Sequence, residues 1–333
     1  MMFRNNSRLE FALEAVQQAA TLAAFIQGKM VTEALTKDDR SPVTVADFAA
    51  QAVVGSLLES SFPGELLVGE EQAEVLRSPD GQEDLEQITN FVGRVIPAIS
   101  PESVCDAIDR GVSDPGENYW TLDPIDGTKG FLRKAQYACA LAYVEKGRVV
   151  LGVLGCPNIT DNLEDSKNGG GSLLAASRGE GSWIAPLDEK LDGEGFTRLQ
   201  VSSQSDPGGA RLLRSFESGH TNTDLIDAFQ EEFGIKADPV RMDSQAKYAL
   251  LAGGKGEIYL RLLSPDKPDY REKIWDQAAG SIIVEEAGGV VTDLDGKKLD
   301  FSQGRTLRNN RGICASNGVF HDRALQALRA VNA

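Results

Sequence analysis

The sequence predicts an α+β fold in its first half and an α/β fold in its second half, and three observations support this. Apolar residues recur at helical spacing over the first sixty residues, paired apolar runs follow from residue 119, and strand and helix patterns alternate after residue 206. The 333 residues are 41% hydrophobic and 25% charged, which is sufficient for a full core. This composition excludes a disordered chain and a collagen-like chain.

Two helices are expected at the start of the chain. Apolar residues at alternating steps of four and three predict the first helix, and they are Leu9, Leu13, Val16, Ala20 and Ala23. Residues 41–44 break this pattern, and apolar residues at every fourth position then predict a second helix, namely Val45, Ala49, Val53 and Leu57. This helix ends at residues 62–64. Residues 78–116 are polar and mixed, which indicates a surface segment with one helix at residues 85–95.

Strands are expected from residue 119 onward. The runs 119–122, 137–145 and 148–156 predict strands, and Lys146-Gly147 between the last two is typical of an antiparallel hairpin. A second hairpin is expected from 173–177 to 182–187. After residue 206 we expect strands near 212 and 240 and at 257–262, 289–293 and 312–316, alternating with helices at 221–233, 245–252, 275–287 and 318–331. We therefore predict an α+β domain at residues 1–205 and an α/β domain at residues 206–333.

The charge of the chain limits its partners. There are 50 acidic and 34 basic residues, a formal net charge of −16. Such a surface repels the phosphates of long nucleic acids, so we expect no nucleic-acid polymer as a partner. No apolar run reaches the roughly 18 residues of a membrane helix, so we expect no membrane partner and a cytoplasmic location. An acidic surface is compatible with binding divalent cations, although solvation alone explains most such surfaces.

The cysteines and histidines of the chain do not form a metal-binding motif. The four cysteines are far apart and form no Cys-x-x-Cys pair; they are Cys105, Cys139, Cys156 and Cys314. We therefore expect packing roles for them, with neither a zinc site nor a disulfide framework. His220 and His321 are the only histidines, which excludes a histidine-rich metal site.

The acidic residues at predicted element ends are better candidates for chemistry. The strongest segment is residues 123–128, Asp-Pro-Ile-Asp-Gly-Thr, which follows a predicted strand. Asp123, the Ile125 carbonyl and Asp126 are the oxygen ligands that a pair of magnesium ions would take. Gly127 allows close approach of the backbone to an anion, and the amides of Gly127 and Thr128 can hold a phosphate if a helix begins there.

Each acidic candidate also has a purely structural interpretation. Asp-Pro and Asp-Gly are ordinary turn signals. The pattern Thr44-x-x-Asp47 fits a helix capping box, and Glu70-Glu71 fits a solvated loop. Asp276 fits an N-cap or first-turn residue of the helix expected at 275–287. Only the joint arrangement of these residues favours a site.

That joint arrangement resembles the lithium-sensitive, magnesium-dependent phosphatases of the inositol monophosphatase superfamily. Their hallmarks are Gly-Glu-Glu, Asp-Pro-x-Asp-Gly-Thr and Trp-Asp-x-Ala-Ala-Gly, which stand here at residues 69–71, 123–128 and 275–280. The resemblance covers nearly the whole chain. It implies a layered αβαβα sandwich of the inositol monophosphatase and fructose-1,6-bisphosphatase type, with the metal site in the cleft between its halves.

Within the superfamily the sequence is most similar to the 3'(2'),5'-bisphosphate nucleotidases. The similarity lies in residues 41–47, 129–133, 243–248 and 272–276, whereas inositol monophosphatases usually have Thr-Asn-Phe where this chain has Lys129-Gly130-Phe131. It implies two to three magnesium ions per site, held by Glu70, Asp123, Ile125, Asp126 and Asp276. It implies that water is oriented and deprotonated by Asp47 and Thr128. The residues it implies for nucleotide binding are His220, Ser244, Lys247 and Arg261.

The implied reaction is hydrolysis of the 3'-phosphate of 3'-phosphoadenosine 5'-phosphate to AMP and phosphate, and the sulfated form of this nucleotide is an open second substrate. Two alternatives remain at this point. One is an inositol phosphate phosphatase of the same superfamily. The other is a non-catalytic nucleotide sensor, for which a damaged ligand set would be expected, whereas every motif carboxylate is present here. Without the resemblance, Lys247 would be an ordinary surface lysine, and Arg261 would fit a solvated strand face equally well.

Overall fold

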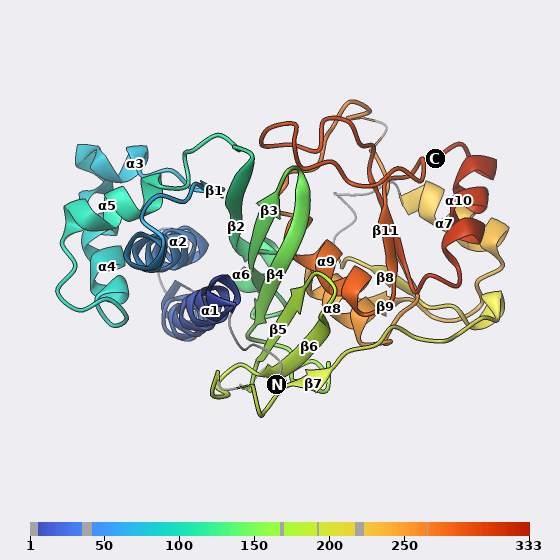
Figure 1. Ribbon diagram of the computed structural model, residues 1–333, viewed down its shortest axis with the longest axis horizontal. Helices are drawn as coiled ribbons and strands as arrows, with labels where there is room; N and C mark the ends of the chain where they lie inside the picture. The colour runs from blue at the N-terminus through green and yellow to red at the C-terminus, as the bar shows by residue number, and fades with distance from the viewer. Residues whose placement is uncertain (1–5, 35–41, 167–169, 192, 217–222, 265) are drawn as a thin grey trace.

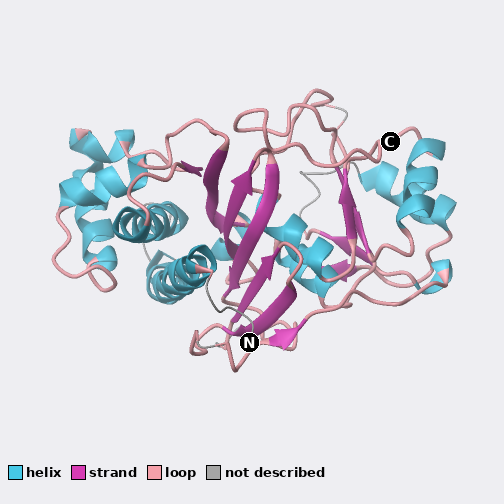
Figure 2. Cartoon of the chain, viewed as in Figure 1, coloured by secondary structure: helices cyan, strands magenta, loops and turns pink. Residues whose placement is uncertain are grey.

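The computed structural model describes residues 6–34, 42–166, 170–191, 193–216, 223–264 and 266–333. Within these ranges helices and sheets alternate in five layers, which run from one end of the molecule to the other (Figure 1). Figure 2 shows the same alternation by secondary structure. The layered αβαβα architecture implied by the resemblance is therefore confirmed.

The first layer is helical. It consists of α1 (Ser7–Ala34), α2 (Pro42–Ser61), α3 (Glu74–Arg77), α4 (Gln82–Val92) and α5 (Pro101–Asp109). Contrary to expectation, α1 is long and apolar enough over Ser7–Met30 to pass for a membrane span by length and composition. However, 61% of its most apolar window is buried inside the structure, because α1 packs against α2 and the first sheet. This helix is therefore part of the core of the fold.

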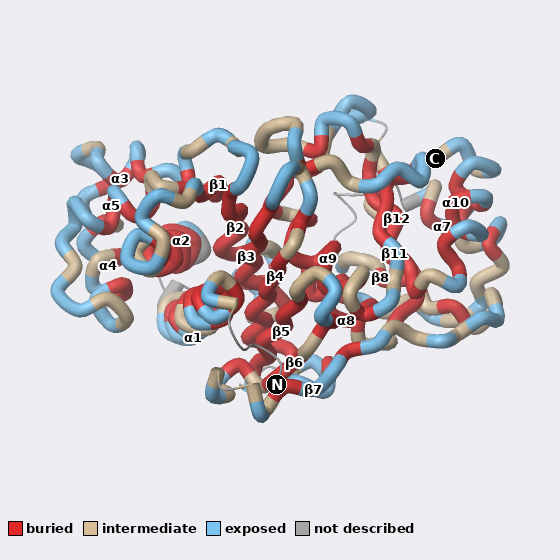
Figure 3. The backbone as a smooth tube through the Cα atoms, in the orientation of Figure 1, coloured by how far each residue is buried: buried red, intermediate tan, exposed pale blue. Residues whose placement is uncertain are grey.

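The first sheet has seven strands in sequential order: β1 (Leu67–Gly69), β2 (Asn118–Asp126), β3 (Ala138–Glu145), β4 (Arg148–Cys156), β5 (Ser172–Ser177), β6 (Gly181–Pro186) and β7 (Thr197–Arg198). Among the described strands of this sheet, β1 and β2 pair in parallel and the other neighbours are antiparallel. Both predicted hairpins are confirmed as β3–β4 and β5–β6. Figure 3 shows that buried residues follow these strands and the helices on either side.

The remaining layers come mostly from the second half of the chain. Between the sheets lie α8 (Ala246–Ala252) and α9 (Ala278–Glu286), and the short helix α6 (Thr128–Leu132) follows β2. The second sheet has the order β11 (Val290–Thr292), β12 (Ile313–Ser316), β10 (Ile258–Arg261), β8 (Leu212–Arg214) and β9 (Val240–Arg241). Its outer face is covered by α7 (Thr223–Phe233) and α10 (His321–Ala330).

Three local predictions differ from the structure. The segment 123–126 continues strand β2 rather than forming a turn, with a shift in register between Asp123 and Asp126. Helix α2 begins at Pro42, so Thr44 lies inside it and the capping box does not explain Asp47. Helix α9 begins at Ala278, so Asp276 stands in the turn before it and is neither its N-cap nor a first-turn residue. All three differences weaken the structural explanations of the acidic residues.

The chain changes from the first sheet to the second between Arg198 and Leu212. One apolar cluster nevertheless contains residues of both sheets together with α8 and α9. The division into domains at residue 206 stays a prediction. All four cysteines are free and buried, as expected for packing residues.

His321 has a packing role at the start of α10. The Thr292 hydroxyl donates to the Asp293 carbonyl at 2.8 Å, so it accepts from Nε2 of His321 at 3.0 Å. The Ser316 hydroxyl lies 3.0 Å from Nδ1 and donates to it. Both ring nitrogens are therefore satisfied by the neutral form of the imidazole. Burial lowers the pKa of His321, and the nearby Asp322 only partly opposes this.

This arrangement predicts a loss of stability in mild acid. Because the folded pKa lies below the ordinary value of 6.5, the unfolded chain takes up the proton first as pH falls. The contribution of His321 to the free energy of unfolding is therefore present above about pH 6.5 and is lost below it. Denaturant unfolding from pH 7.5 to 5.5 should show a steeper fall for the natural protein than for His321→Gln. Parallel curves would contradict the prediction.

Candidate active site

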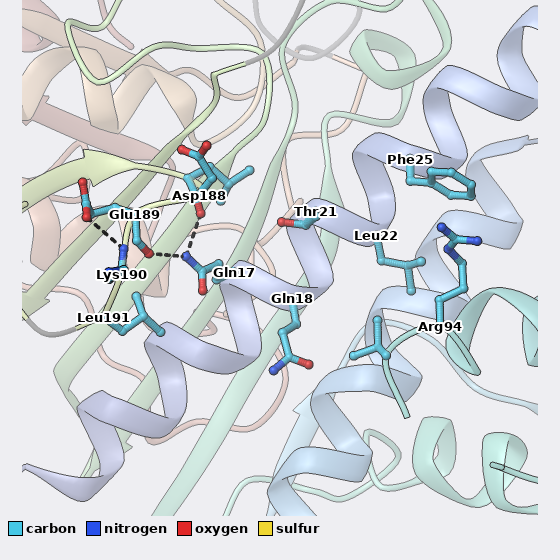
Figure 4. Close-up of a pocket in the computed structure, with 12 residues that line it drawn as sticks. Gln17, Gln18, Thr21, Leu22, Phe25, Arg94, Asp188, Glu189, Lys190 and Leu191 are labelled. Carbon is cyan, nitrogen blue, oxygen red and sulfur yellow. Dashed lines mark hydrogen bonds between the residues drawn. The ribbon is translucent and has the colours of Figure 1, made fainter. Parts of the chain in front are cut away.

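A cavity of about 400 Å³ opens between the two sheets. Its lining contains nearly all the residues that the sequence singled out: Glu70, Asp123, Ile125, Asp126, Gly127, Thr128, Ser244, Lys247, Arg261 and Asp276. A larger cavity of about 700 Å³ lies elsewhere, between α1 and residues 187–191, where Gln17 donates to two backbone carbonyls (Figure 4). That cavity contains none of the motif residues. The cavity between the sheets is therefore the candidate active site.

The parallel pairing of β1 and β2 brings two acidic residues together. Gly69 is opposite Leu122 in this ladder, so the residues that follow, Glu70 and Asp123, are neighbours. Besides burial, the charge of Glu70 raises the pKa of Asp123, so the two carboxyl groups lie close together. The backbone of Glu71 is held from both sides by Gln51, which accepts from its N–H at 3.1 Å and donates to its carbonyl at 2.7 Å. The Gly-Glu-Glu element is thus fixed by its backbone, which leaves Glu70 to line the cavity.

The end of β2 directs the next ligands into the same cavity. Pro124 has no N–H for the ladder, and the register shifts between Asp123 and Asp126. Gly127 then turns the chain with a φ of +96°, and α6 begins at Thr128, as the phosphate-binding prediction required. A side chain at Gly127 would also approach the Cβ of Ser244 to 2.9 Å. Glycine is therefore needed here both for the turn and for the close approach of the two halves.

Asp276 approaches from the other half of the molecule. It stands between Trp275, whose ring packs against the guanidinium of Arg305 at 4.9 Å, and the start of α9. A Cβ at Gly280 in the same motif would lie 2.1 Å from the ring of Tyr248, so no larger residue fits there. Arg305 also donates to the carbonyl of Gly69. The loop that carries Asp276 is therefore linked to the loop that carries Glu70.

These carboxylates crowd one another inside the protein. Burial raises the pKa of Asp123 well above its ordinary value, and the charges of Glu70, Asp126 and Asp276 raise it further. Burial likewise raises the pKa of Asp276, with a further contribution from Asp126. Burial raises the pKa of Asp126, although Lys247 and hydrogen bonds from Gln245 oppose this. Such a buried group of like charges is unfavourable unless a cation offsets it.

Magnesium fits this donor set chemically. The set consists of oxygen donors, and one buried oxygen, Oδ1 of Asp123, makes no hydrogen bond to the described residues. Within those same residues, no three acidic, histidine or cysteine side chains already surround one point at metal-ligand spacing. The carboxylates thus line a common cavity without forming a closed cage. The implied ligands Glu70, Asp123, Asp126, Asp276 and the Ile125 carbonyl stay a proposal.

The two residues implied to act on water lie close to this group. Asp47 is buried inside α2, and its pKa is raised well above the ordinary value by burial and by the charges of Glu71 and Glu70. Thr128 lines the cavity at the start of α6, which packs against α2. Asp47 therefore lies beside the acidic group but is not part of the cavity lining.

One side of the cavity is cationic, and the charges of its Lys247 and Arg261 act on Asp126. Lys247 is only 3% exposed, and its ammonium lies 5.2 Å from the centre of the Tyr259 ring. Arg261 ends β10 and forms a salt bridge with Glu272 at 2.9 Å. Ser244 has a φ of +61°, a conformation that residues other than glycine rarely adopt. The fourth implied residue, His220, lies outside the described residues.

Several residues of the cavity were not predicted. Tyr259 and Tyr270 line its cationic side. Gln277 accepts from the Tyr248 hydroxyl at 2.6 Å and donates to Glu272 at 2.8 Å, so a chain of buried polar groups leads to Arg261. Side chains alternate between the two faces of a strand, so Tyr259 lies on the same face as Arg261 in the strand expected at 257–262. This alternation is the sequence signal that could have identified Tyr259. No sequence pattern points to Gln277.

Comparisons with known proteins agree with this geometry. A model of the inositol monophosphatase family matches residues 5–333. A protein of Oryza sativa named 3'(2'),5'-bisphosphate nucleotidase is 43% identical, with 97% of this chain and 94% of that protein covered. One of the same name from Schizosaccharomyces pombe is 41% identical, with 97% and 95% covered.

Among solved structures, CysQ from Bacteroides thetaiotaomicron, described as a bacterial member of the inositol monophosphatase family, is similar to this fold with a TM-score of 0.64. It is 19% identical, and the similarity covers 95% of this chain and 98% of that one. The resemblance indicated by the three motifs is thus confirmed by sequence and by fold. This chain belongs to the inositol monophosphatase family.

Proposed function

We propose that this chain is a magnesium-dependent phosphatase that hydrolyses the 3'-phosphate of 3'-phosphoadenosine 5'-phosphate to AMP and phosphate. The names of its relatives in Oryza sativa and Schizosaccharomyces pombe support this assignment. A small-molecule substrate also suits a cavity of about 400 Å³ between two sheets. A cytoplasmic location is part of the proposal, and cell fractionation would test it.

The observation that carries the proposal is the environment of Lys247. Among the described residues this buried ammonium forms no salt bridge, whereas Arg261 is paired with Glu272. Burial lowers the pKa of this ammonium to about 8 even though the charges of Asp126, Asp243 and Glu272 oppose this, so an anionic ligand in the cavity would offset part of the cost of burying it. The cavity thus has an acidic side for cations and one phosphate, and a cationic side for a second phosphate. An inositol monophosphate has no group for that second side.

The residues present suggest how the reaction proceeds. Magnesium held by the carboxylates would lower the pKa of water and offset the charge of the phosphate. The Thr128 hydroxyl takes a proton from the attacking water as it passes its own proton to Asp47, so the proton lost by the water ends on the Asp47 carboxylate. The water oxygen bonds to phosphorus while the bond from phosphorus to the 3'-oxygen breaks. That oxygen takes a proton from a second water, and Lys247 and Arg261 hold the remaining phosphate.

Phosphate release in magnesium buffer tests this function. We expect release from 3'-phosphoadenosine 5'-phosphate and much slower release from inositol 1-phosphate at equal concentration. Lithium at millimolar concentration should inhibit the reaction, since a monovalent ion at a magnesium position stabilises the leaving oxygen less well. The sulfated nucleotide, tested in parallel, shows whether it is a second substrate.

The other outcomes separate the alternatives. Faster release from inositol 1-phosphate would keep the carboxylate assignments but contradict the roles of His220, Ser244 and Lys247. Nucleotide binding without release from either substrate would favour a sensor. Release that is indifferent to lithium would contradict the expected metal chemistry.

A further inference from the structure

We propose that Gln245 is a positioning residue that fixes Asp126 and the segment carrying Asp276 relative to each other in the proposed magnesium site. This inference rests on the proposed metal site. The two carboxylates come from different halves of the chain, one from the end of β2 and one from the turn before α9. Gln245 lies between these segments and is bonded to both.

Each polar group of Gln245 has a separate partner. Its backbone N–H donates to Oδ2 of Asp126 at 2.6 Å. Its side-chain Nε2 donates to the carbonyl of Trp275 at 3.0 Å, the peptide unit that leads into Asp276. Its Oε1 accepts from the N–H of Gly280 at 2.9 Å, in the first turn of α9. Gln245 therefore connects the side chain of Asp126 with both ends of the motif at residues 275–280, which carries Asp276.

The local structure shows why an amide is suited to this position. The positive φ of Ser244 precedes Gln245 in the chain, and α8 begins directly after it. Gln245 is 2% exposed, so an unmatched polar group there would be costly. The amide of glutamine offers, on two separate atoms, a donor for the Trp275 carbonyl and an acceptor for the Gly280 N–H. A carboxylate would set an oxygen against the Trp275 carbonyl, and an apolar chain would satisfy neither group.

The consequence concerns metal affinity. Asp126 and Asp276 repel each other, and the repulsion favours a wider separation when no cation is bound. The backbone N–H of Gln245 holds Asp126 whatever the side chain, and its two side-chain bonds, which methionine would remove, hold the segment of Asp276 against this widening. Groups that orient metal ligands typically contribute about 10- to 100-fold in affinity. We therefore expect the magnesium dissociation constant of Gln245→Met to rise by about this factor.

The experiment compares Gln245→Met with Gln17→Met. Gln17 lies on α1, donates to the carbonyls of Leu187 and Glu189 at 2.8 Å each, and is remote from the motif residues (Figure 4). Both variants remove an amide that bonds to distant backbone. Magnesium binding is measured without substrate, by calorimetry and by the rise of the melting temperature with magnesium concentration. If Gln245→Met does not fold, Gln245→Asn serves in its place, since it stays neutral and keeps the amide but is one methylene shorter.

Weaker magnesium binding in the Gln245 variant, with unchanged binding in Gln17→Met, would support the role. Affinities within twofold of the natural protein in the Gln245 variant would overturn it, as would equal losses in both variants. The experiment distinguishes failure of the proposed function from failure of the role of Gln245. A natural protein that binds magnesium but does not hydrolyse the nucleotide contradicts the function and leaves the role of Gln245 intact.

Discussion

Asp123→Asn is expected to lower turnover by several orders of magnitude while the protein remains folded. Asp123 is 3% exposed and lies among Glu70, Asp126 and Asp276, and its Oδ1 has no hydrogen bond to the described residues. Asparagine keeps the shape but replaces an anionic oxygen with a neutral amide, which is a poor magnesium ligand. Phosphate release from 3'-phosphoadenosine 5'-phosphate at saturating magnesium measures the effect. A variant that retains a tenth of the activity would contradict the role of Asp123 as a magnesium ligand.

Thermal unfolding separates this loss from a folding defect. Without metal, Asp123→Asn should melt at or above the temperature of the natural protein, because the change removes one of several crowded buried charges. Magnesium should raise the melting temperature of the natural protein and have little effect on the variant. Asp293→Asn is the matched control. Asp293 is also fully buried and accepts from Asn310, but it lies outside the cavity.

The sequence identified most of the site because its signals are local. Asp123 and Asp126 share one strand end, and Trp275 and Asp276 share one turn, so short motifs are sufficient to identify them. Local patterns were less reliable for conformation. The segment 123–126 has turn residues, but its pairing with β3 keeps it extended on both sides of a register shift. Tertiary pairing outweighs turn preference there.

The side chains that fix the site were not predicted, for a physical reason. Gln51 bonds to Glu71, Gln245 to Trp275 and Gly280, and Arg305 to the carbonyl of Gly69. Each contact joins segments that are distant in the chain, and neither periodicity nor spacing encodes such a contact. These side chains bond to backbone N–H and carbonyl groups. Because every residue type has such groups, the sequence does not mark the positions that are bonded. Only the folded arrangement shows which polar side chains reach it.

Lys247→Met is expected to remove the preference for a nucleotide with two phosphates. Burial lowers the pKa of Lys247 to about 8, a net cost of about 3 kcal/mol although the charges of Asp126, Asp243 and Glu272 oppose it. A charge-assisted contact between its ammonium and the second phosphate would offset about 1.5–3 kcal/mol, or about 10- to 150-fold in affinity. Methionine fills similar space without the charge. The variant should therefore be at least as stable as the natural protein but bind the bisphosphate more weakly.

The decisive measurement is a ratio of substrates. Adenosine 3'-monophosphate presents the same scissile phosphate without the second one, so kcat/KM for the bisphosphate over the monophosphate isolates that contact. The ratio should fall towards one in Lys247→Met, with kcat/KM for the monophosphate nearly unchanged. Lys255→Met, an exposed lysine just after α8, should keep the natural ratio. An equal loss on both substrates would instead place Lys247 at the reacting phosphate, and an unchanged ratio would leave the second phosphate to Arg261 or to residues outside the described chain.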